Sequence, residues 1–184
     1  MRPFFAALTG VVLLALAAPA VAQDEVIRTG GTRFTADDAE RSRRMREAMA
    51  YATALPPGAP EADYSLVAWC EALVSGHVAV GESLGTTDEL DLRLIALGRA
   101  EAVTFRSALE IGRAVQSPDA VAEAEAAADG ARRQWAPILA GDQAVRDQTF
   151  GLFFGLPGRC EHAARRVSLG ITDAPPTLKD VGLE

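Results

Sequence analysis

The sequence predicts an all-α fold: a single domain of four to five mostly antiparallel helices with one disulfide. Three observations lead to this prediction. Apolar residues recur at intervals of three and four along most of the chain, which is the spacing of one helical face. Capping signals and proline or glycine breaks divide this pattern into segments with short connections, which favours antiparallel neighbours. No alternating apolar and polar run of useful strand length accompanies them.

The first 22 residues have the pattern of a secretory signal peptide. Arg2 precedes an apolar run, and the small residues Ala20 and Ala22 occupy the positions that a signal peptidase reads. The run is short for a bilayer span, so we expect cleavage at 1–22 rather than membrane anchoring. The mature protein is therefore expected in the periplasm or outside the cell, with no membrane span after cleavage.

The rest of the chain reads as one domain with irregular ends. Residues 23–34 include a glycine pair and no sustained period, so we expect a flexible arm. The helical domain is predicted over residues 35–169, and residues 170–184 are expected to form a loose tail. The net charge of −7 disfavours nucleic acid as a partner.

The individual helices follow from the periodic segments and their caps. The first begins near Thr35, which with Asp38 resembles a capping box, and it ends at Leu55. Further helices are expected over residues 60–84, over 88–115, from 117 to a kink or end at Pro137, and from 142 to 169 with a break at 155–158. The helix over 88–115 carries the most apolar surface, so we expect it to be central.

The first half of the first predicted helix is crowded with arginines: Arg41, Arg43, Arg44 and Arg46. We interpret them as a solvated face whose charges pair with Glu40 and Glu47. An anion-binding patch is the alternative, which is disfavoured because the chain is acidic overall. The sequence does not show whether this cluster binds anything.

The two cysteines are predicted to form a disulfide. Cys70 lies in the apolar seam of the second helix and Cys160 on the apolar face of the last one, and an exported protein meets an oxidising environment. A zinc site would also need His77 and His162, but Cys160 and His162 diverge around their helix and no paired chelating motif occurs. The C-x-x-C-H haem motif is missing as well, so we predict no metal and no cofactor.

His77 and Glu101 break the apolar pattern and are the candidate binding residues. In the seam of the second helix, His77 is expected to be a core histidine with a hydrogen-bond partner. Glu101 lies within the main apolar stripe of its helix, so we expect it to be buried and paired. Antiparallel packing could bring the two together, more often as a structural ion pair than as an active site. Gly76 and Gly81 beside His77 are expected to allow close helix packing.

The motifs that are missing favour a protein without catalysis. The chain contains no Walker loop, no H-E-x-x-H and no dinucleotide-binding glycine signature. We therefore expect a non-catalytic binding or envelope-associated module, with a protein or a small molecule as partner and no catalytic residue. Two alternatives stay open: a non-covalent haem or metal bound by His77 with Met45 or Met49, and a small acid-base enzyme that uses Glu101 and His77. The pattern does not determine the oligomeric state.

Overall fold

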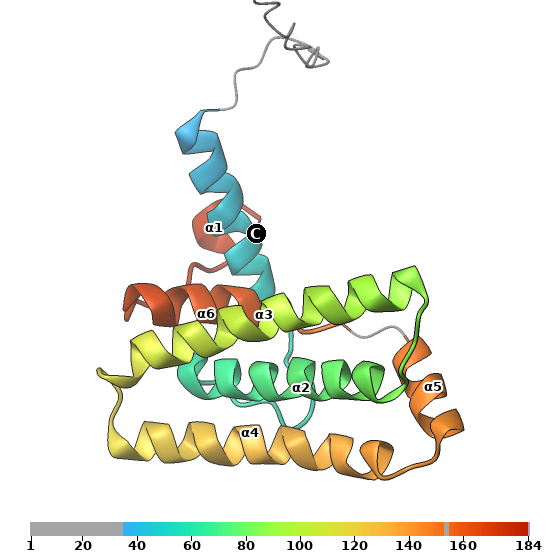
Figure 1. Cartoon of the computed structure of the whole chain (residues 1–184). Helices are drawn as coiled ribbons and strands as arrows, with labels where there is room; N and C mark the ends of the chain where they lie inside the picture. The colour runs from blue at the N-terminus through green and yellow to red at the C-terminus, as the bar shows by residue number, and fades with distance from the viewer. Residues whose placement is uncertain (1–34, 153–154, 184) are drawn as a thin grey trace, which may run out of the picture. The chain divides into compact units, whose positions relative to one another are not determined.

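The computed structural model describes residues 35–152 and 155–183, which are helical and contain no strand (Figure 1). The helices are α1 (Ala36–Ala52), α2 (Asp63–Ser83), α3 (Glu89–Arg113), α4 (Pro118–Leu139), α5 (Gln143–Gly151) and α6 (Arg159–Leu169), followed by a 3-10 turn, η1 (Lys179–Val181). The all-α class is confirmed. Among the described residues there are six helices rather than four to five, because the last predicted helical region is two separate helices. The predicted signal peptide (1–22) and arm (23–34) lie outside the described residues.

Local sequence explains where most of the helices begin. The side chain of Thr35 accepts a hydrogen bond from the backbone N–H of Asp38, which confirms the predicted capping box. Asp88, Ser117 and Asp142 cap α3, α4 and α5 in the same way, each accepting backbone N–H groups of the first turn. These caps satisfy donors that a helix start otherwise leaves unpaired.

Helix α2 is the centre of the fold, and the prediction that the helix over 88–115 is central is wrong. Helix α2 contacts α3, α4, α5 and α6, and its residues are buried on several sides. Helix α3 buries only one narrow stripe, against α2 and α6, which includes Ile95, Gly98, Ala102 and Phe105. The large apolar residues of α3 lie mostly outside this stripe and are exposed. Helix α2 has few charged residues and is apolar around most of its circumference, whereas charged residues interrupt the apolar ones along α3, so α2 can be enclosed on several sides.

Two glycines of α2 make this close packing possible. A Cβ atom added at Gly76 would lie 2.0 Å from Cδ1 of Trp135 on α4, and one at Gly81 would lie 2.4 Å from Cε2 of Phe150 on α5. No side chain fits at such distances without a shift of its neighbour. The interpretation of Gly76 and Gly81 as packing glycines is confirmed.

The disulfide between Cys70 and Cys160 is confirmed. It joins α2 to α6 with the two Cα atoms 6.1 Å apart, and both cysteines are fully buried. Cys160 faces the core, whereas His162 on the same helix is only partly buried. The two side chains therefore point to different sides of α6, as the helical spacing predicted.

Helix α1 stands away from the other helices and rests on α6 and the 3-10 turn (Figure 1). Residues 170–183 are held more closely than the loose tail that the sequence suggested. The turn at Lys179–Val181 packs against α1, and the Asp173 carbonyl accepts a hydrogen bond from the Arg166 guanidinium. Helix α1 is therefore held by contacts with α6 and with the 3-10 turn that follows it.

Reduction of the disulfide between Cys70 and Cys160 is expected to lower the free energy of unfolding by about 4 to 5 kcal/mol in the chain-entropy model. The reason is that the bond joins residues 90 positions apart, so the reduced unfolded chain gains much conformational freedom. Urea denaturation with and without reductant measures the effect, and added zinc should change little. Two titratable thiols in unfolded, non-reduced protein would contradict the disulfide.

The Gly76→Ala variant is expected to lose about 1 to 3 kcal/mol of stability, because the new methyl group overlaps the indole of Trp135. Gly130→Ala on α4 is the matched control. Its Cβ would meet no atom closer than 3.7 Å, so this variant should gain up to about 1 kcal/mol from helix propensity. Thermal or urea denaturation compares the two, and equal effects at both positions would argue against close α2–α4 packing.

Candidate functional site

His77 is buried where α2 meets α4 and α5. Only 8% of the residue is exposed, and its ring stacks on Phe150 at a centroid distance of 4.8 Å, with Trp135 at 6.1 Å. Burial lowers the pKa of His77, and a hydrogen bond with the backbone of Phe150 opposes this only in part. The imidazole is therefore neutral at pH 7 and packs as a core histidine between aromatic rings.

Glu101 is exposed, so the prediction that it is buried is wrong. The stripe that faces α2 is rotated around α3 relative to the stripe of large apolar residues, and Glu101 lies on the latter. Partial burial beside α6 and the charge of Glu161 raise the pKa of Glu101. Because its charged neighbour is Glu161 while His77 stacks on Phe150, the structure does not bring Glu101 and His77 together as an acid-base pair.

One catalytic sequence motif occurs in the chain, but its residues do not have the backbone structure that the motif requires. Residues 81–85 read G-E-S-L-G, which matches the G-x-S-x-G pattern of serine hydrolases, a match that the sequence analysis missed. That pattern requires a sharp turn from a strand into a helix, whereas Ser83 lies in the last turn of α2. Its hydroxyl donates a hydrogen bond to the carbonyl of Val80, as a helix-end serine commonly does. Ser83 therefore lacks the context of a nucleophile.

The residues considered for haem or metal binding lie apart. Met45 and Met49 are on α1, which contacts α6 and η1, whereas His77 faces α4 and α5. Both cysteines are in the disulfide. Within the part of the chain that the structure describes, no three His, Cys, Asp or Glu side chains are grouped to hold a metal ion.

A buried ion cluster joins α1, α2 and α6, and the sequence analysis missed it. The Arg166 guanidinium contacts Glu47 at 3.2 Å and Asp63 at 2.8 Å, and Arg166 and Glu47 are only 5% and 3% exposed. Tyr51 donates its hydroxyl to the other oxygen of Asp63 at 2.6 Å, and burial raises the pKa of Tyr51 so that it stays protonated. The partners are far apart in sequence, so no local pattern identifies them.

One arginine of the cluster on α1, Arg43, contacts this buried ion cluster through Glu47. Arg43 pairs with Glu40 and Glu47, as predicted, but Glu47 is buried rather than part of a solvated face. Glu47 is shared between Arg43 on its own helix and Arg166 on α6. One arginine of the cluster thus has a structural role in attaching α1.

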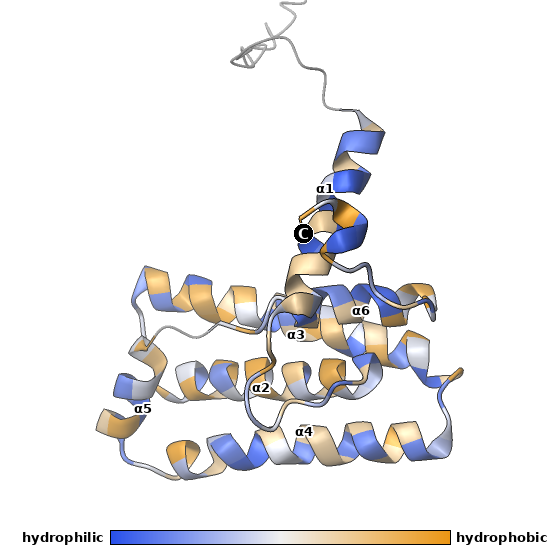
Figure 2. Ribbon diagram, turned by 180° about the vertical axis from the view of Figure 1, so that it is seen from behind, coloured by the Kyte–Doolittle hydropathy of each residue, from blue (hydrophilic) through white to orange (hydrophobic). Residues whose placement is uncertain are grey.

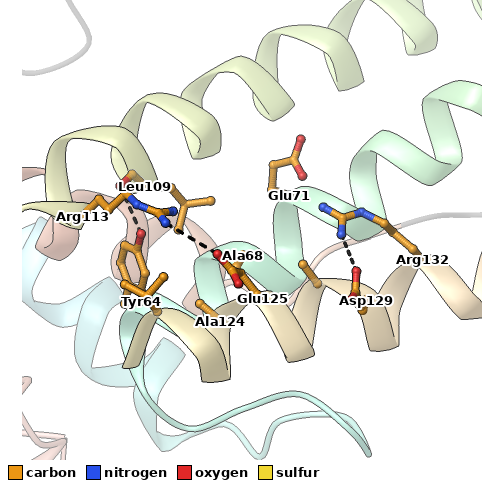
Figure 3. A pocket seen from close by; sticks show the side chains of 11 residues that line it. Tyr64, Ala68, Glu71, Leu109, Arg113, Ala124, Glu125, Asp129 and Arg132 are labelled. Atoms are coloured by element: carbon orange, nitrogen blue, oxygen red, sulfur yellow. Dashed lines mark hydrogen bonds and ion pairs between the residues drawn. The ribbon is translucent and has the colours of Figure 1, made fainter. Parts of the chain in front are cut away.

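An open groove of about 380 Å3 runs between α3 and α4, with α2 as its floor (Figure 3). Its base is made of small and apolar side chains, among them Ala68, Ala124, Ala128 and Leu109. Its rims are charged with both signs: Glu71, Arg113, Glu125, Asp129 and Arg132. The groove therefore offers an apolar floor on which a ligand can lie closely and charged edges that can orient it.

Three arginines recur on α3 at intervals of seven residues, Arg99, Arg106 and Arg113, and the last of them lines the groove. They pair with Glu82 at 2.8 Å, Glu71 at 3.4 Å and Glu125 at 3.6 Å, and each arginine side chain is more than half exposed. A guanidinium has five N–H donors, so each retains donors that face solvent. We call these three residues the arginine row.

Comparison of this chain with protein-family models, with curated proteins and with solved structures returns no match. None of the helices in the described residues combines the length and the apolar character needed to cross a membrane. The site is therefore interpreted from its own geometry.

The Arg166→Met variant is expected to lose about 3 to 5 kcal/mol of stability, because it leaves the buried Glu47 carboxylate without its cation from α6. Removing both charges in Arg166→Met/Glu47→Leu should recover part of the loss. The control is Arg132→Met, which breaks an exposed pair and should change stability by less than about 0.5 kcal/mol. Urea denaturation of the four proteins tests this, and a loss no larger than that of the control would contradict a buried pair.

Proposed function

We propose that this chain is an exported, non-catalytic binding module, and that its groove between α3 and α4 binds a helical segment of a protein partner. The observation that carries the proposal is the arrangement of three helices around the groove: α3 and α4 both pack on α2 and leave the surface between them open. In helical bundles such a position is commonly occupied by a further helix.

The chemistry of the groove supports a helical ligand. Alanines at its base, such as Ala68, Ala124 and Ala128, would let a ligand backbone approach closely. The arginine row repeats every seven residues, which is about 10 Å along a helix axis. Acidic side chains repeated every seven residues on a partner helix would meet it in register. The expected ligand is therefore an amphipathic helix with an acidic edge.

Export is supported by two features of different kinds. The sequence predicts a signal peptide over residues 1–22, and a disulfide between buried cysteines is a feature of proteins that fold in oxidising compartments. The two alternatives are less favoured. An acid-base enzyme would need Glu101 beside His77, and a haem protein would need Met45 or Met49 beside His77, and neither arrangement is present.

The Arg113→Glu variant should bind the partner at least about 10-fold more weakly than the wild type, because it reverses one charge of the arginine row at the groove. Arg133→Glu is the matched control, since Arg133 is also exposed but does not line the groove. Partners would first be captured from an extract of the source cells and identified by mass spectrometry. Their affinities for the three proteins would then be measured by titration.

Cross-linking provides a second measurement at the same site. A photo-reactive residue in place of Asp129, on the α4 rim, should link to the partner, while one in place of exposed Glu123 should not. Equal binding by the two charge variants, or cross-links from position 123 alone, would contradict the groove as the binding site. A small molecule in place of a protein would contradict the helical ligand.

A further inference from the structure

A leucine stripe lies uncovered on the first half of α3. Leu90, Leu94 and Leu97 follow one another at intervals of four and three, and 58%, 40% and 67% of these residues are exposed. Figure 2 shows hydrophobic positions on the turns of α3 that extend beyond α6. Adjacent large apolar side chains on one helix face of a water-soluble domain indicate a contact surface. We call these three residues the leucine stripe.

The neighbouring helices leave this stripe open. Helix α6 packs on the second half of α3, where Val167 lies against Gly112 and where Phe105 and Ala164 line the same open pocket of about 390 Å3. The stripe continues from that contact toward the N-terminus of α3. It is also distinct from the groove, because neither Leu94 nor Leu97 lines the groove.

Two charges on either side of Leu97 have no ion-pair partner among the residues that the structure describes. Arg93 is exposed and makes no ion pair with another described residue. Glu101, one turn beyond Leu97, has no ion pair with a described residue either, and its charged neighbour Glu161 has the same sign. A cation and an anion are thus placed on opposite sides of Leu97, each four residues from it.

We propose that the leucine stripe is the interface at which a second copy of this chain packs, with the two α3 helices antiparallel about a two-fold axis near Leu97. In this orientation Arg93 of one copy lies toward Glu101 of the other, twice over, because the interface is isologous. A parallel arrangement would place Arg93 near Arg93 and Glu101 near Glu101, which is unfavourable. The antiparallel dimer therefore supplies the missing partner of each charge.

Charge also argues against a membrane as the occupant of this face. The whole chain has a net charge of −7, so an anionic lipid surface is repelled. The first half of α3 carries three carboxylates and two arginines, so it offers no basic face to such a surface. A contact between two half-helices is smaller than a standard protein interface, so the dimer should be weak, with a Kd in the micromolar range.

The oligomeric state in solution tests the proposal. The protein would be expressed from its full coding sequence, so that any processing takes place, and purified with its disulfide intact. Sedimentation equilibrium from about 10 µM to about 500 µM should show a monomer that dimerises with concentration. Leu97→Asp should remain monomeric over the same range. Val103→Asp is the matched control, because Val103 is also exposed on α3 but lies off the stripe, and it should dimerise like the wild type.

A charge swap tests the orientation. Arg93→Glu and Glu101→Arg should each raise the dimer Kd by about 10-fold, since each places like charges together, and the double variant should return the Kd to within about 2-fold of wild type. Circular dichroism melting confirms that every variant is folded. A protein that is monomeric at all concentrations, or a dimer that Val103→Asp disrupts and Leu97→Asp does not, overturns the proposal. A double variant that fails to recover overturns the antiparallel arrangement.

Discussion

Close contact at α2, where glycines replace side chains, is the constraint on which the rest of this structure depends. The indole of Trp135 and the ring of Phe150 occupy the space that side chains at Gly76 and Gly81 would fill. This allows α4 and α5 to lie directly on the α2 backbone, while the disulfide between Cys70 and Cys160 ties α6 to a further side. A helix buried on so many sides can organise its neighbours without a sheet, and the groove between α3 and α4 follows from their shared floor.

A second, polar interaction governs the part of the chain that the apolar core does not reach. Helix α1 buries few apolar residues, and it is attached through Glu47, which Arg43 and Arg166 share. Buried ion pairs of this kind add little net stability compared with an apolar contact, but they are strongly destabilising when one partner is lost. The ion cluster therefore specifies where α1 sits more than it strengthens the fold.

The two surfaces with unused binding capacity lie on different sides of α3. The arginine row reaches the groove at Arg113, whereas the leucine stripe lies on a face that α6 leaves uncovered. A dimer formed through the stripe would leave both grooves accessible, so the protein could present two binding sites together. Such pairing raises the effective affinity for a partner that is itself repeated or clustered. The neutral, enclosed His77 and the exposed Glu101 contribute to packing and to the dimer surface rather than to a common active site.

The sequence by itself determined the all-α class, the capping box at Thr35 and the disulfide, because these depend on residues within one or two turns or on the only two cysteines in the chain. Three features were decided by the tertiary structure alone: which helix is central, the exposure of Glu101 and the burial of Glu47. Apolar residues cover more than one face of α3, so periodicity could not tell which face meets α2. Likewise, Glu47 and Arg166 are 119 positions apart, and only the folded chain brings them within hydrogen-bond distance. Local spacing defines a helix, but the choice of its buried face depends on neighbours that are distant in sequence.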